Sequence, residues 1–270
     1  MGQNSIVLDI ARKEKYKPCG TRFGGSPDVP ADFVWPTFEG EDYYGDVAER
    51  PLAFLAQINC EDIAPLDKEN LLPDHGLLSF FYSVVSEPAG FDPKDKCGIK
   101  VYWFEDLSAL SKAEFPEDLD EDSIFPMVKI KIKNENSYPC WDDFTIKFSE
   151  ADDEAFEEAQ EELEVEEPEE SSKLLGWPDV NQSSMYKDLD FIMKGYYLGN
   201  SEGYAKITEK DREEAMTAID RWQLLFQLDT VECGDFMLML GDCGRLYVFI
   251  KKDDLVNRNF DNIWGFMQSN

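Results

Sequence analysis

The chain has 270 residues, with 57 acidic and 26 basic side chains and a formal net charge of −31. Hydrophobic residues make up 43% of it, including 19 Phe, 11 Tyr and 6 Trp, which is sufficient for a packed core. The charge argues against direct binding of nucleic acids and of anionic membranes, because the field of the protein repels phosphate groups. It favours basic partners.

The six cysteines indicate a reducing compartment. They are widely spaced and form no C-x-x-C pair, so the spacing is neither that of a zinc site nor that of a small disulfide scaffold. The segment MGQNSIVLDIARKEK at residues 1–15 mixes charges with a short apolar run, unlike a signal peptide. The longest nearly apolar run, LLSFFYSVV at 77–85, is too short to span a bilayer. We therefore expect a cytoplasmic protein without a membrane segment.

The first predicted element is a tight turn in FGGSPDVP at residues 23–30. A Walker-type phosphate loop needs Gly-x4-Gly-Lys-Ser/Thr, and no lysine follows these glycines. Pro27 and Pro30 obstruct the helix that a dinucleotide fingerprint requires. Gly24 and Gly25 instead predict a turn with positive φ that serves the fold.

Seven apolar segments predict the strands. In chain order they are LAFLAQIN (52–59), HGLLSFFY (75–82), KVYWFED (100–106), MVKIKIKN (127–134), WQLLFQLD (222–229), CGRLYVFI (243–250) and DNIWGF (261–266). The segment 127–134 alternates, with aliphatic residues on one face and Lys129, Lys131 and Lys133 on the other. This pattern is typical of an edge strand or of a solvated face.

Helices are expected to be fewer. The segment 208–222, TEKDREEAMTAIDRW, has Thr208 as an N-cap and Asp211 three residues later. Shorter helical turns are predicted in CEDIAPL (60–66), DLSALSKAEF (106–115) and KKDDLVNRNF (251–260). The acidic segment 150–170 holds thirteen Asp or Glu and places its apolar residues at helical intervals. It is either a solvated helix that ends at Pro168 or a disordered segment.

Three signals occur twice in the same order. They are Gly-x-Pro-Asp-Val at 25–29 and 176–180, an apolar strand ending in Gln57 or Gln227, and a glycine turn before a strand at Gly76 or Gly244. We therefore predict an α+β, mainly β fold in one compact domain over 1–270. Two similar halves, approximately 20–149 and 171–270, are joined by the acidic segment and pack about a pseudo-twofold axis. Seven turn residues are interpreted as structural: Gly24, Gly25, Pro27, Gly76, Gly176, Pro178 and Gly244.

The chain offers little for metal or histidine chemistry. His75 is the only histidine, so multi-histidine metal sites are impossible and any nucleophile–histidine pair would use this residue. It lies in the turn LPDHG, where solvent exposure is the more common explanation. The acidic stretch DLDEDS at 118–123 lacks the glycine of a calcium loop. We predict no metal and no cofactor.

Gln57 and Gln227 are polar residues inside apolar strands, where each must find hydrogen bonds. Either each glutamine holds the Gly-x-Pro-Asp turn of its own half, or both face a cleft shared between the halves. In the second hypothesis, Arg22 is the candidate for binding an anion, and tryptophans wall the cleft with flat apolar surface. The further candidates for ligand or partner binding are Trp35, Trp177, Gln182 and Asp242.

The motifs RFGGSPDVP…WP, PLAFLAQIN, LPDHGLLSFF, LLGWPDVNQ, LLFQLD and GDCGRLYVFI follow one another from about residue 20 to the C-terminus. This combination resembles the YwqG-like family, mostly bacterial proteins labelled as a domain of unknown function. The resemblance implies an internally duplicated α+β fold and a cytoplasmic location, but no established activity. Members occur near toxin and immunity loci, which implies an interaction role. The acidic segment 150–170 departs from the family pattern.

Three functions follow from these observations. The first is an interaction module whose acidic surface docks a basic protein, with an immunity-like role as one form of this function. The second is a small-ligand-binding protein with a cleft between the two repeats. The third is a metal-independent enzyme that works through carboxylates. We rank them in this order.

Overall fold

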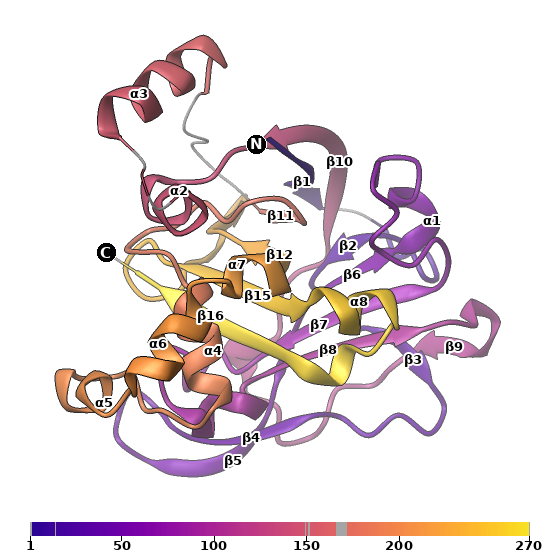
Figure 1. Ribbon diagram of the computed structural model, residues 1–270. Coiled ribbons are helices and arrows are strands. Elements are labelled where there is room, and N and C mark those ends of the chain that lie inside the picture. The colour runs from indigo at the N-terminus through magenta and orange to yellow at the C-terminus, as the bar shows by residue number, and fades with distance from the viewer. Residues whose placement is uncertain (1, 14, 149, 151, 166–171, 270) are drawn as a thin grey trace.

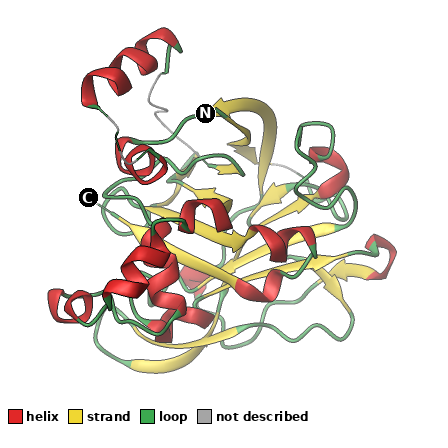
Figure 2. Cartoon of the chain, in the orientation of Figure 1, coloured by secondary structure: helices red, strands yellow, loops and turns green. Residues whose placement is uncertain are grey.

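Strands from both halves of the chain build one large sheet in the computed structural model, which describes residues 2–13, 15–148, 150, 152–165 and 172–269 (Figures 1 and 2). Among these residues, ten strands form the sheet in the order β16-β15-β12-β11-β1-β10-β2-β6-β7-β8. Neighbouring strands are antiparallel throughout. The mainly β architecture confirms that part of the sequence prediction.

The sheet has a central pair of long strands and two flanks. The central pair consists of β1 (Gln3–Lys13) and β10 (Val128–Ser137). From the centre outward, one flank consists of β2 (Arg22–Phe23), β6 (Ala53–Asn59), β7 (Leu77–Tyr82) and β8 (Ile99–Phe104). The other consists of β11 (Lys173–Leu174), β12 (Trp222–Leu228), β15 (Arg245–Lys251) and β16 (Ile263–Gln268). Both flanks therefore run outward in chain order.

The sheet curls so strongly that its two edges meet. The edge strands β8 and β16 contact one another, and the rings of Phe80 on β7 and Phe226 on β12 stack with centroids 4.3 Å apart. Because side chains alternate along a strand, Leu78, Phe80 and Tyr82 enter the interior cluster while Phe81 points to the outside. The main core thus lies inside the curled sheet.

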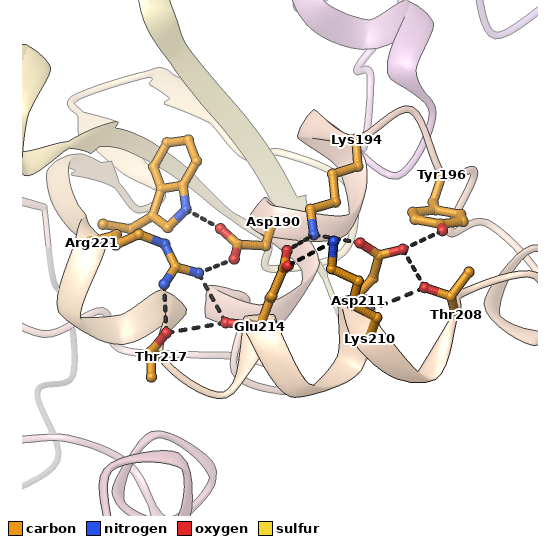
Figure 3. A network of polar contacts seen from close by, with 10 residues as sticks. Asp190, Lys194, Tyr196, Thr208, Lys210, Asp211, Glu214, Thr217 and Arg221 are labelled. Atoms are coloured by element: carbon orange, nitrogen blue, oxygen red, sulfur yellow. Dashed lines mark hydrogen bonds and ion pairs between the residues drawn. The ribbon is translucent and has the colours of Figure 1, made fainter.

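Helices cover the outer face of the second flank (Figure 1). They are α4 (Tyr186–Met193), α5 (Ser201–Ala205), α6 (Glu209–Ala215) and α7 (Ala218–Arg221). Their apolar residues pack with Trp222, Phe249 and Phe266 of the sheet. A polar network ties the helices together (Figure 3). In it, Lys194 binds Asp211 and Glu214 at 2.5 Å each, and Arg221 pairs with Asp190.

A β-hairpin covers the outer face of the first flank instead. It consists of β4 (Thr37–Glu41) and β5 (Val47–Pro51), which run along the lower edge of the molecule in Figure 1. Its Phe38 packs with Leu52, Phe54 and Phe81. The two flanks therefore share their strand order but carry different outer layers.

The remaining elements are short. Two further small sheets pair β3 (Asp28–Pro30) with β9 (Leu110–Lys112) and β13 (Val231–Cys233) with β14 (Phe236–Leu238). The other α-helices are α1 (Cys60–Ile63), α2 (Trp141–Lys147), α3 (Asp153–Glu162) and α8 (Lys252–Val256). Single 3₁₀ turns span Pro93–Cys97, Leu107–Ala109, Glu121–Ser123 and Phe260–Asn262. Within the described ranges, no helix is both long and apolar enough to cross a membrane.

Several predicted elements have different bounds in the structure. The helix expected over 208–222 begins after the Thr208 cap but breaks into α6 and α7, and the Thr217 hydroxyl at the break donates to the Glu214 carbonyl. The segment 106–115 makes one helical turn and then the strand β9, because it pairs with β3. The strand 127–134 is central rather than an edge. The sequence analysis did not anticipate β1 or the β4–β5 and β13–β14 hairpins.

The acidic segment forms a helix, α3, which projects from the top of the molecule in Figure 1. The Asp152 side chain caps it by accepting from the Glu154 N–H at 2.9 Å. Phe156 holds it against α2, with its ring centroid 4.9 Å from that of Phe144. The helix ends at Glu162, before the predicted stop, and Pro168 itself lies outside the described residues.

Candidate functional site

The two Gly-x-Pro-Asp segments are tight turns with the same backbone. Gly24 and Gly25 have φ of +60° and +68°, and the corresponding Leu175 and Gly176 have φ of +60° and +76°. This confirms the predicted positive-φ turns. A Cβ on Gly176 would lie 2.2 Å from the Ser137 Oγ, so this position needs glycine for space as well as for φ.

Each turn is attached to a bulge in the neighbouring strand. The pairing register shifts at Leu55 in β6 and at Leu225 in β12. A bulge frees a backbone carbonyl from the ladder. The Leu55 carbonyl accepts from the Gly24 N–H at 2.7 Å, and the Leu225 carbonyl accepts from the Leu175 N–H at 3.4 Å. The strand irregularities therefore fix the positions of the turns.

The first turn is organised around the carboxylate of Asp28. Gln57 accepts from the Asp28 N–H at 3.0 Å through Oε1 and donates to its carboxylate at 2.8 Å through Nε2. The same carboxylate accepts from Arg22 Nη1 at 2.9 Å, from the Cys19 N–H at 3.0 Å and from the Tyr16 hydroxyl at 2.7 Å. The Asp28 turn thus joins five residues in one network, in which Tyr16 is exposed and the other four residues are buried or partly buried.

This network holds fixed charges. Asp28 is 1% exposed and Arg22 is 2% exposed. Burial alone would raise the pKa of Asp28, but hydrogen bonds from Tyr16 and Gln57 and the charge of Arg22 outweigh it and hold that pKa below its ordinary value. Burial and the bond to Asp28 raise the pKa of Tyr16 to about 12. The carboxylate therefore stays ionised and the phenol stays protonated at neutral pH, as in a structural ion pair.

The second turn repeats this arrangement around Asp179. Gln227 Oε1 accepts from the Asp179 N–H at 2.9 Å, and Gln227 Nε2 donates to the Asp179 carboxylate at 2.9 Å. Lys173 takes the place of the arginine, with Nζ 2.6 Å from Asp179. Burial lowers the pKa of Lys173 in spite of the nearby Asp179 charge. The Asp179 carbonyl accepts from Arg245 at 3.0 Å and from the Tyr247 hydroxyl at 2.7 Å.

Two hypotheses were open for the glutamines: that each holds the Gly-x-Pro-Asp turn of its own half, or that both face a shared cleft. The hydrogen bonds are those of the first, since Gln57 binds Asp28 and Gln227 binds Asp179. The other turn residues also have structural positions. Pro27 and Pro178 are buried between glycine and aspartate in the two turns, and Gly76 and Gly244 directly precede β7 and β15.

The remaining candidate residues lie in different surroundings. Trp35 donates from Nε1 to the Leu52 carbonyl at 2.9 Å, in the aromatic cluster under the β4–β5 hairpin. Trp177 is buried with α4 on the second flank. Gln182 is exposed near the C-terminal end, where its side chain donates to the Ser269 carbonyl at 2.6 Å, and Asp242 is exposed in a loop. The structure brings Arg22 and Gln57 together but does not gather these four residues around them.

Two surface features were missed by the sequence analysis. One is a pocket of about 390 Å³ beside Arg22, lined on its polar side by Lys15, Lys17, Lys129 and Lys131. The alternating lysines of 127–134 were the available signal. The other is the β4–β5 hairpin, for which the acidic and aromatic segment EGEDYYGDVAER was the signal.

The structure describes His75 as an exposed turn residue. Its Nδ1 lies 2.6 Å from Asp74 and its Nε2 lies 3.5 Å from Glu105. The hydrogen bond to Asp74, which has the larger effect, and the one to Glu105 both raise the pKa of His75. In the part of the chain that the structure describes, no three His, Cys, Asp or Glu side chains group as metal ligands.

The geometry is that of two similar turn networks, each with a glutamine that binds an aspartate paired to a buried cation. No curated protein matches the chain. A family model described as a domain of unknown function matches residues 21–268, which includes both turns and both glutamines. The chain therefore belongs to the DUF1963 family, a domain of unknown function.

Proposed function

We propose that this protein is an interaction module that docks a basic protein through the β4–β5 hairpin. The observation that carries the proposal is the tip of this hairpin, where Tyr43 and Tyr44 are 93% and 88% exposed. Tyrosine is among the residues that most often dominate the energy of protein interfaces, because it buries a large area with few rotatable bonds. Two adjacent exposed tyrosines on one projecting turn favour a docking role.

The tip is ordered before any partner binds. The Asp42 carboxylate accepts from the Tyr44 N–H at 2.9 Å and from the Asp46 N–H at 3.0 Å. Arg50 reaches across the hairpin to the same carboxylate at 2.8 Å. The rings of Tyr43 and Tyr44 meet edge to face at 5.5 Å. A preordered surface loses less conformational entropy on binding.

The outer face of the hairpin is acidic. Glu39, Glu41 and Glu49 are exposed on it, and Glu39 lies directly opposite Glu49 in the strand pairing. Like charges opposite one another destabilise a strand pair by roughly 0.2–1 kcal/mol. A lysine or arginine of a partner placed between them would relieve this repulsion. Charge complementarity therefore supports a basic partner.

The net charge of −31 supports the same partner class, because it would speed encounter with a basic protein in a salt-dependent manner. In an immunity-like role, this partner would be a basic toxin such as a nuclease. We place the encounter in the cytoplasm, where the six unpaired cysteines would stay reduced.

A photo-crosslinking residue in place of Tyr44, in a lysate of the source organism at several salt concentrations, tests the proposal. We expect one basic protein to crosslink, with a yield that falls as salt rises. The variant Glu39→Lys/Glu49→Lys should abolish the crosslink. Its matched control is Glu158→Lys/Glu162→Lys on α3, which makes the same change of net charge at exposed positions and should leave most of the yield. Equal losses in both variants, or in neither, would overturn docking at the hairpin.

A small-ligand-binding protein is the second candidate, and the pocket beside Arg22 favours it. We further infer that the chain arose by internal duplication of segments near 20–149 and 171–270. This inference is supported by the matching turns, bulges and glutamine–aspartate bonds. The motif order also supports placing the chain among YwqG-like proteins.

A further inference from the structure

A basic pocket lies where the central strands meet the first turn. It has a volume of about 390 Å³, which is within the range of small-molecule sites, and it is bounded by β10 and by the segment from Lys15 to Arg22. β10 pairs with β2 at Lys129 and Arg22, so residues more than a hundred positions apart share this wall. The pocket is separate from the β4–β5 hairpin.

The charge of the pocket is opposite to that of the protein. The chain has more than twice as many acidic as basic side chains, yet five basic residues and a single acidic one line this site. The acidic residue is Asp62, whose carboxylate accepts from the Thr21 hydroxyl at 2.7 Å. The basic residues are Lys15, Lys17, Arg22, Lys129 and Lys131. A concave site lined mainly by positive charges attracts anions.

The lysines project from two directions. Lys129 and Lys131 stand two residues apart on β10, so they share its solvent face, and Lys15 and Lys17 are exposed on the segment opposite. The Nζ of Lys131 lies 3.7 Å from the carboxylate of Asp9. Ammonium groups on flexible stems bind phosphate as point charges and adjust to its position.

Arg22 forms a rigid part of the wall. Its guanidinium donates to Asp28 at 2.9 Å, to the Ser26 carbonyl at 2.6 Å and to the Gly20 carbonyl at 3.3 Å. Its buried Nε has no hydrogen-bond partner among the described residues. The wall therefore contains an arginine fixed by its own hydrogen bonds beside the lysines.

We propose that this pocket binds a small organic phosphate, with its phosphate groups among Lys15, Lys17, Lys129 and Lys131. A phosphate group carries close to two charges at neutral pH, so one or two of them complement a site lined by four lysines. Met127 also lines the pocket and adds apolar surface for the organic part. A polymeric anion is disfavoured, because it would extend beyond the pocket into the acidic field of the protein.

This inference deepens the second candidate function, ligand binding, and is independent of docking at the hairpin. Calorimetric titration of the full chain with sodium pyrophosphate tests it. We expect saturable 1:1 binding that weakens as salt rises. The variant Lys129→Gln/Lys131→Gln should lose about tenfold or more in affinity, on the scale of one ion pair for each lysine.

Lys133→Gln is the matched control, because Lys133 lies on the same face of β10, two residues beyond Lys131 and outside the pocket lining. It should leave the affinity within about twofold. Lys15→Gln/Lys17→Gln provides a second variant outside the sheet, in case the strand substitutions disturb folding. Absence of pyrophosphate binding at millimolar concentrations, or equal binding by all variants, would overturn the proposal. Glu39→Lys/Glu49→Lys should bind pyrophosphate normally, so failure at the hairpin and failure at the pocket are distinguishable.

Discussion

The Asp28 and Asp179 turns solve one structural problem with different chemistry. Both turns use a glutamine that binds the N–H and the carboxylate of the aspartate. Asp28 is sealed, with a side chain 1% exposed and paired to an arginine, whereas the Asp179 side chain is 17% exposed and paired to a lysine. The glutamine is therefore the common requirement of the turn. The type of cation and its burial determine how much the ion pair contributes to the free energy of unfolding.

The cations also differ in what they can do besides pairing. Arg22 donates to two backbone carbonyls in addition to Asp28, through a planar guanidinium with several donors. Lys173 is a single ammonium whose pKa is lowered by burial, so it can release its proton if its partner is removed. Removing the aspartate should consequently cost more stability in the Asp28 turn than in the Asp179 turn.

The largest expected effect is that of removing the aspartates. Asp28→Ala should lower the free energy of unfolding by about 3–5 kcal/mol, because it leaves Arg22 as a buried charge without its partner. Asp179→Ala should cost about 2 kcal/mol, since Lys173 can lose its proton. Urea unfolding followed by circular dichroism measures both, with the exposed Asp32→Ala as the control. Equal losses at the two turns would contradict the comparison.

Substituting either glutamine should cost a similar amount of stability, whereas substituting the two aspartates should not. Gln57→Leu and Gln227→Leu should each lower the free energy of unfolding by about 1–3 kcal/mol, because each leaves a buried turn N–H and a carboxylate with one partner fewer. The exposed Gln182→Leu serves as the control and should change stability by less than about 0.5 kcal/mol. Clearly unequal melting shifts for the two buried glutamines would break the symmetrical account of the turns.

For the tyrosines we expect the opposite order, with the larger loss of stability at the Asp179 turn. Tyr247→Phe should cost about 1–2 kcal/mol, because the fully buried hydroxyl both donates to the Asp179 carbonyl and accepts from the Asn181 N–H at 3.1 Å. Tyr16→Phe should cost about 0.5–1 kcal/mol, since Tyr16 is 39% exposed and Asp28 keeps its other donors. Thermal melting of the two variants decides the order. A larger loss for Tyr16→Phe would mean that the Asp28 hub depends on its phenol.

A third aspartate sharpens the comparison because its pKa is raised where that of Asp28 is lowered. Asp143 is 0% exposed, neither of its carboxylate oxygens has a hydrogen-bond partner among the described residues, and burial raises its pKa to about 6. Between the unfolded pKa of 3.8 and about 6, the folded state binds a proton that the unfolded state lacks. The Asp143 contribution therefore favours folding increasingly as pH falls through 6.

Asp143→Asn removes this contribution. The free energy of unfolding of the wild type, relative to that of the variant, should increase by about 1 kcal/mol between pH 7 and pH 5. Using the difference cancels the other titrating groups. Asp28→Asn should show the opposite sign in more acidic solution, since its folded pKa is lowered and its stabilisation is lost as pH falls. A pH-independent difference for Asp143→Asn would show that this carboxyl is hydrated or partnered in solution.

Local patterns predicted much of the fold. The alternation and apolar character of the predicted strand segments placed most of the sheet, and the glycine–proline spacing identified both turns at their observed positive φ. Predictions were poorer for segments whose conformation depends on the strand with which they pair. The segment 106–115 became a strand because β3 lies beside it, and β1 was missed although it is one of the two central strands.

The sequence by itself determined the two turns, the glutamines that serve them and the acidity of the surface, because these depend on residue type and short spacing. Only the tertiary structure decided that Arg22 and Lys173 belong to the aspartates, through the pairing of β2 with β6 and of β11 with β12. It also decided that Lys15 and Lys17 face Lys129 and Lys131 across one pocket. Those contacts join residues far apart in the chain, and antiparallel register carries no local signature that names the partner strand.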